Sequence, residues 1–184
     1  PLMMAIRIAI AGNVMDLGMD KHFNVEQDLE HILQQDFAIC DYDAFKTKLN
    51  GAENILYLGD NAGESVFDKI LIEAMGKPVT YVVRDKPIIN DVTMKDAIDS
   101  DLDRVAKLIS SGSPAPATIL KLCNRDFLDR FEKADLIISK GQGNYEGLSD
   151  SDKPVFFLLK AKCPVIANDI GVKEDDIVLL SAQK

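Results

Sequence analysis

Apolar and polar residues alternate along the chain in blocks that predict strands and helices in turn. Five short apolar runs are typical of buried strands, and they cover residues 55–58, 79–83, 136–139, 155–159 and 177–180. Runs that are apolar on both faces suit a parallel sheet with helices on both sides. Because these runs alternate with helical patterns, the sequence predicts an α/β fold built on a layered sheet.

Helical periodicity fills the intervals between these runs. Segments with an apolar face are predicted as helices, and they cover residues 3–16, 25–34, 43–49, 65–75, 93–98, 103–109 and 119–131. Thr93 is predicted to cap the helix at 93–98, with Asp96 as its capping-box partner. In open parallel sheets, ligands bind beyond the carboxyl ends of the strands, so the residues after each strand are the candidates for chemistry.

Composition narrows the class of protein. The 184 residues are enough for one domain with a sizeable core, so we expect residues 1–184 to form a single domain. The formal net charge of -9 argues against a broad nucleic-acid surface. No apolar run reaches the length of a membrane span, and no signal peptide is visible. The 3 cysteines lack the spacing of a disulfide framework or a zinc site, which fits a reducing cytoplasm.

The turn after the strand at 55–58 carries acids beside its glycines. Asp60, Asn61 and Glu64 lie next to Gly59 and Gly63, which permit a sharp turn. Carboxylate and amide oxygens are hard ligands that suit Mg²⁺ or Mn²⁺. The alternative is that Asp60 and Asn61 only cap the helix that begins near Glu64, because Asp and Asn are favoured caps.

The strand at 79–83 is followed by a second acidic turn. Asn90 and Asp91 precede the predicted helix at 93–98, and both roles are compatible: Thr93 caps the helix while Asp91 points into a site. Asn13 and Asp16 lie late in the otherwise apolar helix at 3–16. These two polar residues either mark the end of the helix or face a site that the helix lines, and the sequence favours neither explanation.

The two later strands are followed by lysines and glycines. Gly141 and Gly143, with Asn144 after them, lack the third glycine of a dinucleotide fingerprint, so they indicate a tight turn whose amides approach a ligand. Lys140 either neutralises phosphate charge or is solvated. Lys160 ends a very apolar strand and points either to solvent or to the cleft.

Three strings of residues resemble those of a known family. They are L-G-D-N-A-G-E at 58–64, K-P-I-I-N-D at 86–91 and S-K-G-Q-G-N-Y-E at 139–146. Together they resemble the metal-dependent damage-control phosphatases, formerly a numbered domain of unknown function, in their small archaeal and bacterial branch. Residues 9–13 and 156–164 also fit this branch, so the resemblance spans nearly the whole chain.

The resemblance implies a three-layer α/β/α sandwich with a mostly parallel, Rossmann-like sheet. It implies a divalent metal (Mg, Mn, Co or Ni) held by Asp60, Asn61 and Asp91, and hydrolysis of small phosphometabolites such as sugar phosphates. The family lysine that holds phosphate falls on Lys160, with Lys140 as a second candidate. The chain opens at Pro1 in a helical pattern, so we expect the C-terminal catalytic portion of a protein with a further N-terminal helical segment. The family tends to have Gly-Thr where this chain has Ala117 and Thr118.

The expected site contains catalytic residues and substrate contacts. Catalytic contributions are expected from Asp60, Asn61, Glu64, Asp91 and Lys160, and substrate contacts from Asn13, Asn90, Lys140, Gly141, Gly143 and Asn144. The expected partner is a small-molecule phosphate ester in the cytoplasm, with no nucleic acid and no membrane. The sequence does not specify an oligomeric state.

Two nucleophiles and three other functions stay open at this point. We favour a water activated by the metal with help from a carboxylate such as Glu64, over direct attack by an aspartate. Haloacid-dehalogenase phosphatases carry a second Asp two residues after the first, where this chain has Ala62. The main alternative function is a non-catalytic nucleotide- or phosphate-binding Rossmann-like module. A scaffold domain, whose acids only cap helices, and a Rossmann-fold methyltransferase, which would need a glycine-rich first loop, are less favoured.

Overall fold

One sheet forms the centre of the protein, and the computed structural model describes it within residues 1–12, 30 and 32–182. The strands are β1 (Phe37–Cys40), β2 (Ile55–Leu58), β3 (Val79–Val83), β4 (Lys107–Ser110), β5 (Leu136–Lys140), β6 (Val155–Lys160) and β7 (Ile177–Ser181). Their order across the sheet is β1-β7-β6-β5-β2-β3-β4. All pairs are parallel except β6 with β7, which is antiparallel. The prediction of a mostly parallel sheet is confirmed.

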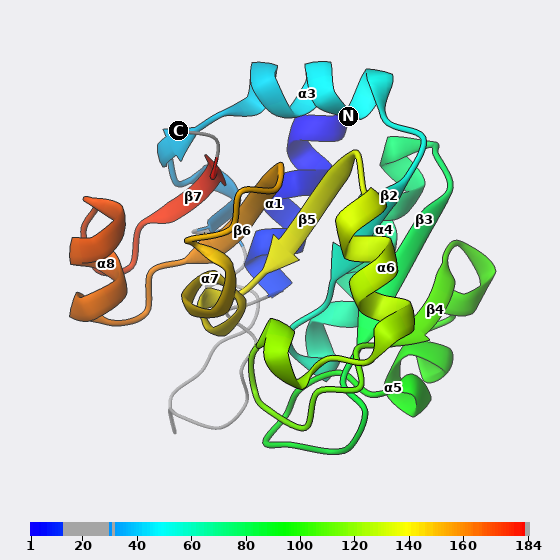
Figure 1. Ribbon diagram of the computed structural model, residues 1–184. Coiled ribbons are helices and arrows are strands. Elements are labelled where there is room, and N and C mark those ends of the chain that lie inside the picture. Colours follow the sequence, from blue (N-terminus) through cyan, green and yellow to red (C-terminus); the bar gives the residue numbers. More distant parts are fainter. Residues whose placement is uncertain (13–29, 31, 183–184) are drawn as a thin grey trace.

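Helices cover both faces of the sheet (Figure 1). On one face lie α1 (Leu2–Gly12), α3 (Tyr42–Gly51) and α4 (Ser65–Met75), around one hydrophobic cluster. On the other face lie α6 (Arg125–Lys133), α7 (Gln142–Leu148) and α8 (Pro164–Ile170), around a second cluster. The short helix α5 (Met94–Asp99) follows β3. The α/β/α layering that we expected is therefore present.

Several predicted elements differ from the structure. The helix predicted at 103–109 is wrong, because a short 3₁₀-helix (Leu102–Arg104) leads into the edge strand β4. This strand has only two apolar residues, Leu108 and Ile109, and so short a run fits either element when the neighbouring strand is unknown. The helix predicted at 119–131 is divided into a 3₁₀-helix (Leu120–Leu122) and α6, which Asn124 caps by accepting from Phe127 N at 2.9 Å.

Other local predictions are confirmed or fall outside the described residues. Thr93 and Asp96 form the predicted capping box of α5. The first helix ends its described part at Gly12, so the end of the predicted segment 3–16 and most of 25–34 lie outside the described residues. Two helices, α7 and α8, and the strand β1 were not predicted. In α7 the reason is its glycines, which lower helix propensity.

The topology places one edge of the sheet as the natural site. From β2 the chain proceeds outward to β3 and β4, and from β5 it proceeds the other way to β6. The neighbouring strands β2 and β5 therefore mark the topological switch point, beyond which ligands bind in such sheets.

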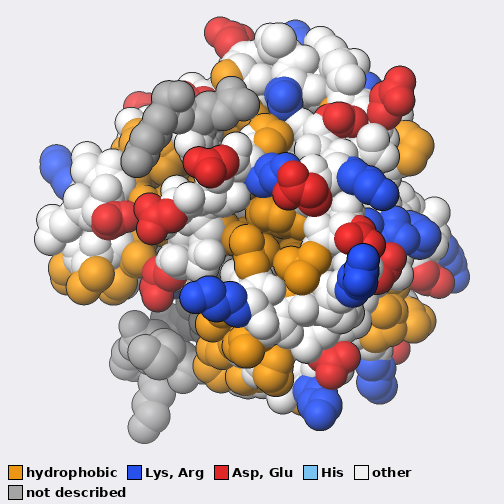
Figure 2. Space-filling model, in the orientation of Figure 1, with side chains coloured by type: hydrophobic (Ala, Val, Ile, Leu, Met, Phe, Trp, Pro, Cys, Tyr) orange, Lys and Arg blue, Asp and Glu red, His pale blue; other side chains and the backbone are white. Residues whose placement is uncertain are grey.

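The surface adds two observations. Figure 2 shows acidic and basic side chains interspersed on the viewed face, so charge of one sign does not dominate it. None of the helices in the described part of the chain is long and apolar enough to cross a membrane.

Candidate metal-binding site

Backbone hydrogen bonds join the two acidic turns at the switch point. Asn61 and Asp91 form an isolated antiparallel bridge. On either side of it, Ala62 N donates to Asn90 O at 2.8 Å and Val92 N donates to Asp60 O at 2.7 Å. The loops after β2 and β3 thus lie side by side, and they bring together the three residues that the sequence predicts as metal ligands.

The side chain of Asn61 is oriented by Glu64. Asn61 Nδ2 donates to Glu64 Oε1 at 2.7 Å, so the amide nitrogen faces Glu64 and the amide oxygen is directed away from it. Glu64 is fully buried, and its Oε2 accepts from Lys140 Nζ at 2.7 Å. Glu64 therefore both directly precedes α4, as its N-cap residue, and orients the Asn61 oxygen, which is the kind of ligand atom that a hard cation takes.

A buried network continues behind Glu64. Lys140 Nζ also donates to Asp68 Oδ1 at 2.7 Å. Asp68 in turn accepts from the hydroxyls of Tyr57 at 2.6 Å and Tyr81 at 2.8 Å, whose rings are stacked. Lys140 is thus completely buried rather than solvated.

The charges in this network stabilise one another. Burial alone would lower the pKa of Lys140, but the carboxylates of Asp68 and Glu64 outweigh burial and raise it above its ordinary value. The pKa values of Tyr57 and Tyr81 are raised well above the ordinary value by burial and by the Asp68 carboxylate. Both hydroxyls therefore stay protonated and remain donors to Asp68.

Asp60 lies where a side chain of residue 141 would stand. A Cβ on Gly141 would overlap the Asp60 carboxylate, and even its farther oxygen Oδ1 would be only 3.0 Å away. Burial and the neighbouring carboxylates of Glu64 and Asp91 raise the pKa of Asp60 to about 8, although Arg84 and Lys140 oppose this rise. A cation among these oxygens would relieve the repulsion between them.

Sequence reasoning gave no role to several residues that the structure places around the site. Arg84 is buried and donates from Nε to Asp91 Oδ2 at 2.7 Å. Asp68 lies one helical turn after Glu64 on the buried face of α4. An acidic residue on the apolar face of a predicted helix is a sequence signal for such a role. Tyr57 and Tyr81 are paired in the strand register, which is visible only once β2 and β3 are aligned.

The remaining predicted residues lie around or beside this centre. Lys160 Nζ lies 2.7 Å from Asp175 Oδ1, in the loop before β7. Asn144 is fully buried and bonded within the chain, while a Cβ on Gly143 would lie 2.8 Å from the Pro116 carbonyl oxygen. Asn13 and Asp16 lie outside the described residues. The catalytic and substrate-binding roles of these residues stay predictions.

The donor set fits a magnesium-like ion rather than a zinc-like one. Within the described ranges, no group of three His, Cys, Asp or Glu side chains is arranged to hold a metal. Asp60, Asn61 and Asp91 instead offer two carboxylates and one amide oxygen, which suits a hard cation that keeps water and takes oxygens from its substrate.

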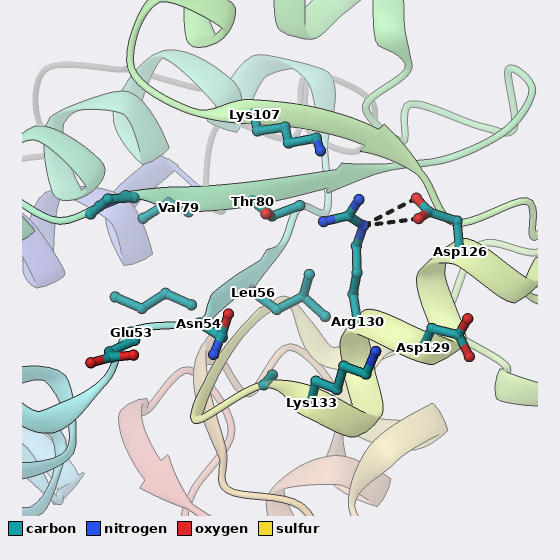
Figure 3. Close-up of a pocket in the computed structure, with 13 residues that line it drawn as sticks. Glu53, Asn54, Leu56, Val79, Thr80, Lys107, Asp126, Asp129, Arg130 and Lys133 are labelled. Carbon is teal, nitrogen blue, oxygen red and sulfur yellow. Dashed lines mark hydrogen bonds and ion pairs between the residues drawn. The ribbon is translucent and has the colours of Figure 1, made fainter.

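A groove of about 530 Å³ lies elsewhere, at the amino ends of β2 and β3 beside α6 (Figure 3). Arg130 reaches across it from α6 and is hydrogen-bonded to Asp126 at 3.1 Å. Lys107 and Lys133 on its walls are balanced by acids, including Asp129. Because it lies at the opposite end of the strands from the acidic turns, it contains none of the predicted ligands.

The chain matches one protein family and several of its members. The family model for the damage-control phosphatase ARMT1-like domain matches residues 1–178. The chain is 43% identical to the uncharacterized protein MJ0202 of Methanocaldococcus jannaschii, over 93% of this chain and 60% of that protein. It is 40% identical to the damage-control phosphatase PH1575 of Pyrococcus horikoshii, over 96% of this chain and 64% of that protein.

A solved structure has the same fold. The crystal structure of the Pyrococcus horikoshii protein, described as a member of the DUF89 family, superposes with a TM-score of 0.91 at 38% identity. The match covers 99% of this chain and 66% of that one. The chain thus spans less than two thirds of the length of these relatives.

Proposed function

We propose that this chain, which belongs to the damage-control phosphatase ARMT1-like domain family, is a divalent-metal-dependent phosphatase of small phosphate monoesters such as sugar phosphates. The observation that carries the proposal is the convergence of Asp60, Asn61 and Asp91 at the switch point of the sheet. The name of the Pyrococcus relative, a damage-control phosphatase, supports the reaction class.

In this proposal Asp60, Asn61 and Asp91 hold the cation. When bound, a divalent cation supplies positive charge for a phosphate oxygen and lowers the pKa of water. Glu64 has the role of orienting Asn61, because its two oxygens accept from Asn61 and Lys140. This assignment replaces the general-base role that we expected for Glu64.

The two lysines have different roles. Lys140 is enclosed between Glu64 and Asp68, so it holds those carboxylates in place rather than contacting phosphate. Lys160 remains the candidate for phosphate, since its partner Asp175 is 73% exposed and such a pair is weak, about 0–1 kcal/mol. A phosphate group could therefore displace Asp175 at little cost. Asn90 and Gly141 lie in the turns around the site and Gly143 in the first turn of α7, and all three are retained as substrate contacts.

The test is hydrolysis of p-nitrophenyl phosphate and a panel of sugar phosphates, with Mg²⁺, Mn²⁺, Co²⁺ and Ni²⁺ each tested. Asp60→Asn and Asp91→Asn are expected to abolish hydrolysis. Asp60→Asn should retain the fold and, without metal, unfold at a higher temperature than the wild type, because burial among other acids disfavours the Asp60 carboxylate, whereas Asn is neutral in the folded and the unfolded chain. Circular dichroism and thermal unfolding check both points.

Asp129→Asn is the matched control, because it makes the same change in the groove at the other end of the sheet. It should leave the activity unchanged. Full activity in Asp60→Asn would contradict the proposal, and lost activity in Asp129→Asn would move the site to the groove. Stabilisation by nucleotide alone, with no hydrolysis and no metal requirement, would favour the non-catalytic binding module.

A further inference from the structure

Arg84 is a buried charge at the end of β3 that connects three different segments. Its Nε donates to Asp91 Oδ2 at 2.7 Å, its Nη1 to Thr118 Oγ1 at 3.2 Å and its Nη2 to Asn144 Oδ1 at 2.8 Å. The side chain is only 1% exposed. The planar guanidinium therefore contacts the predicted ligand Asp91 with one donor and the loop after β4 and the helix α7 with two others.

Asn144 extends these contacts to the remaining strand ends. Its Oδ1 also accepts from Thr118 N at 2.9 Å and Thr118 Oγ1 at 2.8 Å. Its Nδ2 donates to Gly59 O at 3.1 Å and Lys140 O at 2.9 Å. One side chain thus connects the ends of β2 and β5 to the loop after β4, and Arg84 adds the end of β3.

The backbone around this network is closely packed. A Cβ on Gly147 would lie 2.5 Å from Thr118 O, and one on Gly143 would lie 2.8 Å from Pro116 O. The glycines of α7 therefore allow the loop at 116–118 to approach the helix closely enough for Asn144 to reach Thr118. The G-x-G string that resembled a nucleotide fingerprint has a packing explanation here.

Packing alone does not explain a buried arginine. Taking a charge out of water is costly, and apolar residues of similar volume often replace buried ion pairs without loss of stability. A charge retained at this position has a different use: it limits the orientations of the Asp91 carboxylate. Partners behind a metal ligand typically change metal affinity by roughly 10- to 100-fold when they are removed.

We propose that Arg84, Thr118 and Asn144 form a positioning clip that sets the orientation of Asp91 for cation binding. The inference rests on the proposed function, in which Asp91 is a metal ligand. Arg84 is a positioning residue in this scheme, since it contacts the ligand and not the substrate. Thr118 has the smallest side chain of the three, so its substitution disturbs the surrounding packing least.

The test is titration calorimetry of the whole chain with Mn²⁺. Thr118→Val removes the hydroxyl at nearly constant volume and should weaken Mn²⁺ binding by roughly 10-fold, and Arg84→Met by up to roughly 100-fold. Thr118→Ser keeps the hydroxyl and should restore the affinity of the wild type. Arg84→Lys, which can reach Asp91 but lacks the planar fork, should restore only part of it.

Arg130→Met is the control, because it makes the same substitution at an exposed Arg–Asp pair on α6, in the groove at the opposite end of the strands. It should bind Mn²⁺ as the wild type does. Unchanged affinity in both Thr118→Val and Arg84→Met would overturn the clip and leave the metal site intact. If Arg84→Met does not fold, Thr118→Val and Thr118→Ser decide the question. A wild type that binds no divalent cation would overturn the proposed function and the clip together.

Activity gives a second readout that a merely structural role would not move. For the variants that fold, the Mn²⁺ concentration at half-maximal activity should rise by the same factor as the dissociation constant. The kcat at saturating Mn²⁺ should stay near that of the wild type. A loss of kcat that added Mn²⁺ does not restore would contradict a positioning role.

Discussion

One added methyl group at Gly141 should weaken both stability and metal binding, whereas one at a control glycine should weaken stability alone. Gly141 joins β5 to α7 with φ of 76° and ψ of 160°, a conformation essentially restricted to glycine. Its Cβ would overlap the Asp60 carboxylate. Gly141→Ala therefore imposes a backbone cost and also forces Asp60 out of its place.

The two costs can be estimated separately. The conformation of Gly141 costs a non-glycine residue about 1–3 kcal/mol. Turning Asp60 away from the new methyl group adds about 0.5–1.5 kcal/mol if the side chain leaves its rotamer. Gly171 has φ of 83° and ψ of 32°, in the left-handed region that costs another residue about 1–2 kcal/mol, and nothing lies within 4 Å of its Cβ, so Gly171→Ala carries a backbone cost alone.

Urea unfolding and Mn²⁺ titration of the two variants test this reasoning. Through the backbone, Gly171→Ala should lose about 1–2 kcal/mol and Gly141→Ala about 1–3 kcal/mol of unfolding free energy. Only Gly141→Ala should lose measurable Mn²⁺ binding and hydrolysis. Wild-type affinity in Gly141→Ala would refute the role of Asp60 as a ligand, and lost affinity in Gly171→Ala would show that backbone strain alone explains the effect.

Three further outcomes follow from burial and charge. The pKa of Asp60 is raised from an ordinary 3.8 to about 8 in the folded protein. Between these two pH values, the folded protein without metal keeps a proton on Asp60 that the unfolded chain has lost. Its unfolding free energy should therefore fall from about pH 4 to about pH 8 relative to Asp60→Asn in EDTA, and a rise would contradict the assignment. Tyr57→Phe removes a 2.6 Å hydrogen bond to the buried Asp68 carboxylate and should cost about 1.5–3 kcal/mol in urea unfolding, whereas a cost near zero would show that Tyr81 alone suffices. Ile89 is 86% exposed with φ of 48°, a backbone conformation that Asn tolerates better than Ile. Ile89→Asn should therefore raise the unfolding free energy by about 1 kcal/mol and Tm by about 2–4 °C. A lower Tm would contradict backbone strain at Ile89.

The local elements of the site were predictable because their signals are local. Buried strands appear as apolar runs, and β2, β3, β5, β6 and β7 all begin where those runs begin. Acidic residues in a turn after a strand indicate oxygen ligands. Because the carboxyl ends of parallel strands lie at one edge of the sheet, the acidic turns are expected to meet there. The edge strand β4 was missed because its identity depends on pairing with β3, which lies outside the window that periodicity examines.

Sequence alone thus determined the α/β class, the acidic turns and their common edge, since these depend on residues close together in the chain. Tertiary structure decided which side chains meet. Lys140 reaches Glu64 across 76 positions, and Arg84 reaches Asn144 across 60. The difference between a solvated lysine and a fully buried one is set by desolvation and by the carboxylates that surround it. These depend on the packing of α4 and α7 against the sheet, so no local pattern in the chain reports them.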